Sequence, residues 1–318
     1  MLSLNGTIIN HPNFILLGIP GLQEVYLWLS VPMCSIYLAT LLGNGLVLFL
    51  IMTEKKLHKP MYLFLSMLLT LGLISSTAVM PKLLCILWFN LREIAFDNCL
   101  IQMFIIHSFS AMRSAVLVAM AFDRFIAICN PLRYASILSN KIIAEIGLIV
   151  LVRGVALIMP FPLLIQRLNF CRTNVIFHSY CEHIAVAKVA CTDISINNLY
   201  GLVVALLVSV FDLVCIALSY FLIFRAVLKL QSKEAHYKAL NTCAAHICVI
   251  LIAYVPFLFS LLTHRFGHNV PLYIHILLAN FYLLIPAMLN PIVYGMKTKE
   301  IWDRILKIVL KRKVHFDN

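Results

Sequence analysis

The sequence predicts an all-α membrane protein: a bundle of seven transmembrane helices with a short amphipathic helix after the last span. Three observations predict this fold: the composition, the length of the uncharged stretches, and the uneven distribution of Lys and Arg. The chain has 318 residues, of which 62% are hydrophobic and 12% charged, and its mean hydropathy is +0.96. Soluble domains usually carry about a quarter charged residues, so this composition indicates a protein embedded in a bilayer.

Four stretches of the chain contain no Asp, Glu, Lys or Arg, and a membrane span needs roughly 20 apolar residues. They are residues 25–53, 60–81, 239–264 and 266–296. Three further apolar stretches, near 96–128, 142–165 and 196–224, contain internal charges. The predicted spans, in chain order, are about 25–53, 60–87, 96–128, 142–165, 196–228, 238–264 and 271–296. We find no internal repeat, so residues 1–318 are interpreted as a single domain.

The basic residues predict the orientation of the spans. Connections 54–59, 124–141 and 225–238 and the tail 297–318 hold 17 of the 25 Lys and Arg. Because cytoplasmic loops carry an excess of basic residues, this face is predicted to be cytoplasmic and residues 1–24 extracellular. The first 24 residues lack a positive region and a cleavage site, so the first span is expected to be its own anchor. The protein is therefore predicted to be a multi-pass plasma-membrane protein, and glycosylation is expected at Asn5, in the sequon Asn5-Gly6-Thr7.

The net charge of +12 does not indicate a nucleic-acid partner, because the basic residues cluster beside apolar spans, where they meet lipid headgroups. After the last span, residues 301–311 place apolar side chains at helical spacing with basic residues between them. This pattern predicts an amphipathic helix on the inner leaflet.

Four of the ten cysteines are expected on the extracellular side, where disulfides persist: Cys99, Cys171, Cys181 and Cys191. Three of them fall in the long connection 167–195, which suggests that disulfides constrain this loop. Four cysteines allow three pairings, and their spacing alone does not choose among them.

Charges inside membrane spans are costly and often functional. Asp123 and Arg124 are adjacent at the cytoplasmic end of the third span. Such a pair can neutralise itself, and the long guanidinium can reach a different partner when neighbouring helices move. Taken alone, the pair could equally be an interfacial anchor.

Several further motifs accompany this pair, and together they resemble the rhodopsin-like G-protein-coupled receptors and, within them, the odorant receptors. The resemblance covers about residues 14 to 312. The motifs are Gly43-Asn44, Leu57-His58-Lys59-Pro60-Met61-Tyr62, Lys238-Ala239-Leu240-Asn241-Thr242-Cys243 and Asn290-Pro291-Ile292-Val293-Tyr294. Three segments resemble the class I, fish-like, branch: Val255-Pro256, Thr263-His264-Arg265-Phe266-Gly267-His268 and His178-Ser179-Tyr180-Cys181.

The resemblance implies a receptor that binds a small odorant from outside and activates a stimulatory, olfactory-type heterotrimeric G protein, which raises cAMP. It implies that Arg124, paired with Asp123, meets the G protein, and that Tyr220 and Tyr294 close around Arg124 in the active state. It also implies the pairing of Cys99 with Cys181 and of Cys171 with Cys191.

The ligand is expected to be a small volatile compound or a carboxylic acid, because the resemblance implies that Arg265 anchors an anion and its guanidinium suits a carboxylate. His107 and Ser110 lie one turn apart and can face one pocket. His107 could instead be a core histidine, and Arg265 an interfacial side chain that reaches toward water. The other expected pocket residues are His183, which would cap the pocket, and Tyr254, Phe257, Leu258 and Leu261, which would form its apolar wall.

The centre of the predicted bundle departs from the family pattern. The resemblance implies an acidic residue at the position of Gly72 and Glu at that of Arg113, which together would bind a cation, typically sodium. We hypothesise that the Arg113 guanidinium fills the volume freed at Gly72, that Asn44, Asn290 or Asp212 accepts its hydrogen bonds, and that no cation binds. Alternatively, Arg113 stays unsatisfied and folding suffers, since an unpaired buried charge is costly. Arg153 and Asp212 are interpreted as structural.

Two other classes of protein are less consistent with the sequence. In a transporter or channel we would expect repeats and discontinuous spans lined by ionisable residues, and we find neither. An intramembrane enzyme predicts a nucleophile with its base, or a metal motif such as His-Glu-x-x-His, and we find no such spacing. We therefore expect no enzymatic activity, no cofactor and no bound metal.

Overall fold

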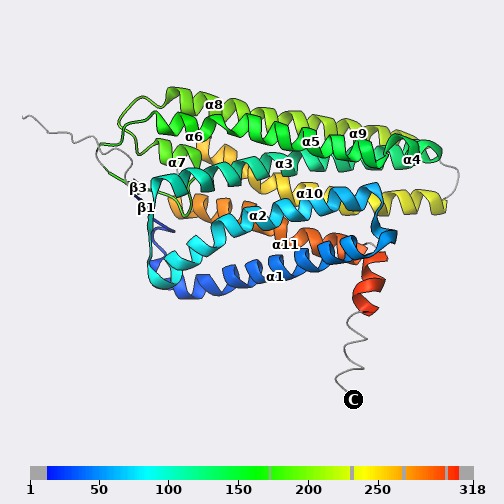
Figure 1. Ribbon diagram of the computed structural model, residues 1–318, viewed down its shortest axis with the longest axis horizontal. Helices are drawn as coiled ribbons and strands as arrows, with labels where there is room; N and C mark the ends of the chain where they lie inside the picture. Colours follow the sequence, from blue (N-terminus) through cyan, green and yellow to red (C-terminus); the bar gives the residue numbers. More distant parts are fainter. Residues whose placement is uncertain (1–12, 172, 230–232, 267–269, 298–299, 308–318) are drawn as a thin grey trace, which may run out of the picture.

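The computed structural model describes residues 13–171, 173–229, 233–266, 270–297 and 300–307. Figure 1 shows long helices that run side by side along the longest axis of the molecule. The prediction of a seven-helix bundle is confirmed. Its helices are α1 (Tyr26–Thr53), α2 (Pro60–Phe89), α3 (Phe96–Cys129), α5 with α6 (Asn140–Ile158 and Pro160–Gln166), α8 with α9 (Ser195–Leu206 and Asp212–Val227), α10 (Lys233–Phe266) and α11 (Leu272–Lys297). A π-helical turn, η4 (Leu207–Phe211), joins α8 to α9.

The bundle has the burial pattern of a protein in lipid. Among the residues that the structure describes, six helical stretches are long and apolar enough to cross a membrane, and α10 contains a shorter apolar part, His246–Phe259. Large apolar side chains lie on the outside, such as Leu42 and Met52, which are 72% and 77% exposed. Polar side chains such as Asn44 are buried inside. Apolar side chains outside and polar ones inside match a bilayer environment, so the chain is a multi-pass membrane protein.

Helix α3 occupies the middle of the bundle and contacts α2, α5, α6, α9 and α10. Nineteen of its residues are buried, among them the charged residues Arg113 and Asp123. Because α3 runs along the length of the bundle (Figure 1), it carries side chains to both ends.

One end of the bundle, called here the disulfide end, is covered by a small sheet that was not predicted. Its strands β1 (Phe14–Leu16), β2 (Glu93–Ile94) and β3 (Val175–Ile176) lie in the order β2-β1-β3. β1 pairs antiparallel with β2 and parallel with β3. A short helix, α7 (His183–Ala187), follows β3, so the connection 167–195 has regular structure of its own. Figure 1 shows β1, β3 and α7 together at this end.

Two disulfides hold this end together. Cys99 at the start of α3 bonds to Cys181, and Cys171 bonds to Cys191 within the loop before α8. This is the pairing that the resemblance implied, and it fixes the loop at two places over the bundle.

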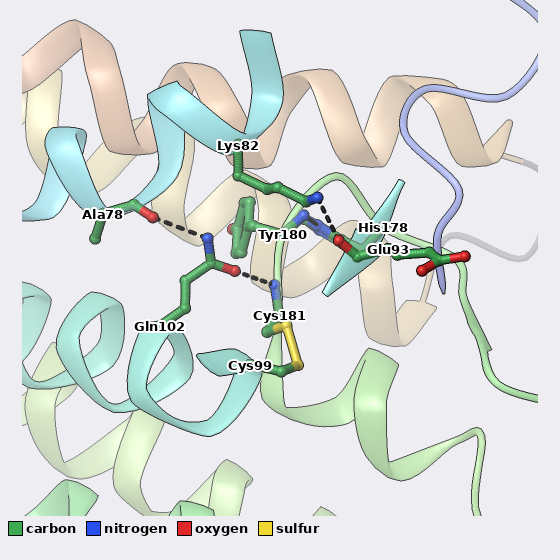
Figure 2. The surroundings of a disulfide bond; sticks show 8 residues. All are labelled: Ala78, Lys82, Glu93, Cys99, Gln102, His178, Tyr180 and Cys181. Atoms are coloured by element: carbon green, nitrogen blue, oxygen red, sulfur yellow. Dashed lines mark hydrogen bonds between the residues drawn. A yellow bond between two sulfur atoms is a disulfide. The ribbon is translucent and has the colours of Figure 1, made fainter. Parts of the chain in front are cut away.

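Hydrogen bonds extend the disulfide into the neighbouring helix, as Figure 2 shows. The Cys181 amide donates to Oε1 of Gln102 at 2.9 Å, and Nε2 of Gln102 donates to the Ala78 carbonyl of α2 at 2.8 Å. Nζ of Lys82 donates to the Glu93 carbonyl of β2 at 2.5 Å. Side chains of α2 and α3 thus satisfy backbone groups of the loop and of the sheet, which positions both over the bundle.

The opposite end, called here the Arg124 end, has the short elements η2 (Lys55–Leu57), η3 (Pro131–Arg133) and α4 (Tyr134–Ile137). Residues 300–307 form a further helix there. Its Ile301 is fully buried and Trp302 is 41% exposed. Arg304 forms an ion pair with Glu54, the residue directly after α1, at 3.0 Å. The predicted amphipathic helix is therefore present, and its final residues, 308–311, lie outside the described part of the chain.

Candidate functional site

A cavity of about 400 Å³ lies inside the bundle near the disulfide end. Side chains from α3, α6, α7, α8, α10 and α11 line it. Five of the predicted pocket residues are among them: His107, Ser110, His183, Tyr254 and Phe257. Leu258 is half-buried on α10 and does not line the cavity. The side chains of Leu261 and Arg265, like all of Asn5, lie outside the described residues.

One face of α3 forms a polar wall of the cavity, because residues three apart in a helix share a face. His107, Ser110 and Arg113 all line the cavity. The His107 ring packs edge-on against Phe161, with centroids 5.2 Å apart. Its Nε2 atom is buried and has no hydrogen-bond partner within the described part of the chain. This atom is therefore available to a polar group of a ligand.

His183 closes the cavity from the loop side. Its ring stacks on Phe161 with centroids 4.1 Å apart, and its Nε2 lies 3.4 Å from the Asn197 amide nitrogen. Burial, and secondarily the nearby His107, lower the pKa of His183 from 6.5 to about 3. A histidine with this pKa is neutral at physiological pH, so it offers an aromatic face and a neutral ring nitrogen.

The Arg113 side chain points toward the disulfide end, into the cavity wall. Nη2 donates to Ser110 Oγ at 3.2 Å, and Nη1 donates to the Leu283 carbonyl at 3.5 Å. The guanidinium carbon lies 6.0 Å from the centre of the Tyr282 ring. The hypothesis that this guanidinium bonds to Asn44, Asn290 or Asp212 is wrong. Helical side chains lean toward the helix N-terminus, and for α3 that direction leads to Ser110.

The volume beside Gly72 is filled by Ala287 of the neighbouring helix α11. A Cβ on Gly72 would lie 3.3 Å from the Ala287 Cβ of α11, so glycine permits a close approach of α2 and α11. Pro291 lacks an N–H, which leaves the Ala287 carbonyl without its helical donor. Nδ2 of Asn44 donates to this carbonyl at 2.8 Å. The expectation that Arg113 occupies the Gly72 volume is therefore wrong, because α11 packs there.

Arg153 and Asp212, on two further spans, form an ion pair. Nη2 of Arg153 on α5 lies 2.9 Å from an oxygen of Asp212 on α9. The Ser114 hydroxyl is 2.5 Å from the same carboxylate and 2.5 Å from the Tyr254 hydroxyl of α10. Arg153 and Asp212, which were interpreted as structural, thus belong to one polar network that joins α3, α5, α9 and α10.

At the Arg124 end, Arg124 bonds to the adjacent Asp123 carboxylate, with Nε at 2.8 Å. The Tyr134 hydroxyl of α4 donates to the other carboxylate oxygen at 2.6 Å. Burial and the bond to Asp123 raise the pKa of Tyr134, so its hydroxyl stays protonated as a donor. The predicted self-neutralising pair is present, and α4 holds it in place.

The two tyrosines predicted to close around Arg124 are engaged elsewhere or unpaired. The Tyr220 hydroxyl lies 2.5 Å from Nδ1 of His246. The Tyr294 hydroxyl is buried and has no hydrogen-bond partner among the residues that the structure describes. The geometry therefore contains the predicted residues without the arrangement proposed for the active state.

Comparison with known proteins identifies this architecture. The sequence model of the family described as "Olfactory receptor" matches residues 33–312. The chain is 56% identical to human olfactory receptor 52P1 over 308 residues, which cover 97% of this chain and 96% of that protein. It is 50% identical to human olfactory receptor 52N4, with 97% of each chain covered. The chain belongs to the olfactory receptor family. It is a rhodopsin-like G-protein-coupled receptor.

Sequence reasoning missed several residues that shape the receptor's cavity and polar network. Phe161 and Tyr282 line the cavity, and Ser114 connects Asp212 to Tyr254. His246 is buried beside Tyr220. The spacing of Ser114 from Ser110 and His107 along α3 could have indicated Ser114, but no local pattern indicates the others.

Proposed function

We propose that this olfactory receptor binds a small odorant in the cavity at the disulfide end and activates a stimulatory heterotrimeric G protein at the Arg124 end, which raises cAMP. The observation that supports this most directly is the pairing of two features on one helix: α3 lines the cavity with His107 and carries Asp123 and Arg124 at its other end. The cavity volume falls within the usual range for small-molecule sites.

The proposed orientation places the disulfide end outside the cell and the Arg124 end in the cytoplasm of a plasma-membrane protein. Disulfides form in oxidising compartments, and the predicted basic connections belong to the Arg124 end. In this orientation Asn5 is outside, where its sequon can be glycosylated.

The ligand is proposed to be a small volatile compound or a carboxylic acid. Apolar walls such as Phe161 and Phe257 suit a hydrocarbon portion, and ring nitrogens of His107 and His183 can hydrogen-bond to a polar group. Arg265 remains the anchor proposed from the sequence for a carboxylate.

Signalling requires that the ligand favour one of two arrangements at the Arg124 end. In the arrangement seen here, Asp123 neutralises Arg124 and Tyr134 bonds to Asp123. We propose that activation frees Arg124 to meet the G protein, with Tyr220 and Tyr294 moving against it. This requires Tyr220 to leave His246.

The test is ligand-evoked cAMP in cells that express the full chain, with surface expression measured on the same cells. A panel of volatile alcohols, esters and carboxylic acids is applied to the wild type, to Arg124→Ala and to Arg167→Ala. Arg124→Ala should reach the surface and lose the response, whereas Arg167→Ala, an exposed arginine near the disulfide end, should keep it. Equal responses of Arg124→Ala and wild type would refute the proposed coupling. Solute or ion flux through purified protein, with no cAMP response, would favour a transporter or channel.

A further inference from the structure

We infer that Arg113 is an anion-binding group in the ligand cavity, deeper than His107, and that the receptor is tuned by it to a ligand with a carboxylate pointing inward. The inference rests on the proposed function, since it names the chemical class of the ligand and the way it lies. It concerns a residue at the centre of the bundle, not the sequence-predicted anchor Arg265.

The first argument is that the structure supplies no counter-charge for Arg113. The residue is 7% exposed, and it takes part in no ion pair within the described residues. The nearby buried carboxylates are already used, since Asp212 pairs with Arg153 and Asp123 with Arg124. The groups around the guanidinium, the Ser110 hydroxyl, the Leu283 carbonyl and the Tyr282 ring, are neutral. A buried cation without an anion is costly, and a bound carboxylate would remove that cost.

The second argument is that Arg113 is accessible to a ligand despite its burial, because it lines the cavity. The hydrogen bonds from Arg113 to Ser110 and to the Leu283 carbonyl are long, at 3.2 and 3.5 Å, whereas bonds from a guanidinium to a carboxylate are typically 2.7–2.9 Å and often bidentate. A carboxylate near Arg113 can also accept from the Ser110 hydroxyl. The neutral contacts seen here are therefore weaker than those that an anion would make.

The third argument is the polarity gradient along the cavity. Arg113 lies six residues along α3 from His107, a rise of about 9 Å. The cavity lining also includes Phe161, Phe257 and Ile276, which suit an alkyl chain. Glu182 and Lys188, which flank α7 on the loop side, line the cavity too, and their opposite charges offset each other. The deeper part of the cavity thus carries the uncompensated positive charge of Arg113, which favours a carboxylate there with the alkyl chain directed outward.

The experiment compares straight-chain hexanoic, octanoic and nonanoic acids with their methyl esters on the wild type, Arg113→Gln, Arg113→Lys and Arg265→Ala. Charge-assisted hydrogen bonds contribute enough that their loss changes affinity roughly 10- to 150-fold. Arg113→Gln should raise the half-maximal concentration for acids by about this factor and leave that for esters within about threefold. Arg113→Lys should retain most of the preference for acids, because it keeps the charge. Surface expression of every variant is measured in parallel.

A second experiment reverses the charge at position 113. Arg113→Glu should abolish the acid response and create a response to protonated octylamine, which the wild type lacks. A variant that merely misfolds responds to neither, and its low surface signal identifies it. If Arg113→Lys keeps the acid response, the loss in Arg113→Gln results from the missing charge and not from misfolding.

Binding without signalling is measured by thermal unfolding of the purified full-length receptor with octanoate, methyl octanoate or chloride. Octanoate should stabilise the wild type and Arg113→Lys but not Arg113→Gln. Equal effects of octanoate on wild type and Arg113→Gln would overturn the inference, as would a loss confined to Arg265→Ala. Stabilisation by chloride equal to that by octanoate would overturn the assignment to a carboxylate ligand. Octanoate binding that depends on Arg113 without any cAMP response would instead refute the proposed signalling and leave this inference standing.

Discussion

Replacing Arg153 with Met tests the polar network that joins four helices. The substitution keeps an unbranched apolar stem at the position and removes the guanidinium that pairs with Asp212 at 2.9 Å. Asp212 then remains a buried carboxylate, with a side chain 1% exposed and the Ser114 hydroxyl as its neighbour at 2.5 Å. We expect this single change to destabilise the receptor strongly.

The magnitude follows from the burial of the two partners. Removing one partner of a buried ion pair costs about 3–5 kcal/mol because the other charge is left uncompensated. The Arg153 side chain is 25% exposed, so we take the lower end, about 3 kcal/mol. For a protein of this size, that free energy corresponds to a fall in Tm on the order of 6 °C. Adding Asp212→Asn to Arg153→Met should restore most of the lost stability, since the amide oxygen can still accept a hydrogen bond from Ser114.

The assay is thermal unfolding of the purified receptor for both single variants and the double variant, which gives a double-mutant cycle. We expect a coupling energy of about 2 kcal/mol between positions 153 and 212. Lys141→Met is the matched control, because Lys141 and Glu145 form an exposed pair at 3.9 Å and such pairs contribute about 0–1 kcal/mol. Additive effects at positions 153 and 212, or an equal loss in Lys141→Met, would show that the network is not the source of stability.

Three further predictions concern the disulfides, a helix contact and pH. Cys181→Ser opens a disulfide spanning 82 residues and Cys191→Ser one spanning 20, so loop entropy predicts losses of about 4.5 and about 3.3 kcal/mol respectively; the order of the two Tm values checks this. Gly154→Ala places a Cβ 2.5 Å from a Met side chain and 3.2 Å from a backbone oxygen, so it should lower stability by about 1–3 kcal/mol. Gly45→Ala meets nothing within 4 Å and should be neutral or stabilising in the same unfolding assay. Because the pKa of His183 is lowered from 6.5 to about 3, its neutral form stabilises the fold fully above pH 6.5, and that contribution is lost as pH falls toward 3. His183→Phe should therefore flatten the decline of Tm between pH 6 and 4, and an unchanged slope would contradict the assignment.

The architecture was predictable from the sequence because the bilayer imposes a simple rule on composition. Apolar stretches long enough to span it are visible without any tertiary information. Four uncharged stretches and three with internal charges predicted the seven spans, and helical spacing predicted the amphipathic helix after them. The sheet at the disulfide end was not predictable in the same way. Its strands are two or three residues long and come from three distant segments, so they are too short for a local pattern of alternating residues to predict them.

The candidate site was predictable only where local spacing settles geometry. That His107 and Ser110 share a face follows from helical periodicity, whereas the resemblance assigned that face to the pocket; the Asp123–Arg124 pair follows from adjacency. The Arg153–Asp212 pair depends on how α5 and α9 pack, which spacing along one helix does not contain. Phe161 lines the cavity because α6 follows α5 at Met159 and Pro160, which is likewise a matter of packing.

Arg113 shows why the same residue can be identified correctly and placed wrongly. Its position in the sequence suggested that a guanidinium would take over the space and partners of a lost cation site. That reasoning treated the freed volume at Gly72 as available, yet α2 and α11 use it to approach each other, with Ala287 against the glycine. The guanidinium must then find polar surroundings elsewhere, and the direction in which helical side chains lean takes it toward Ser110 and the cavity. The glycine at position 72 and the arginine at position 113 therefore act on different spaces. The first tightens the contact between two helices, and the second changes the charge that a ligand meets.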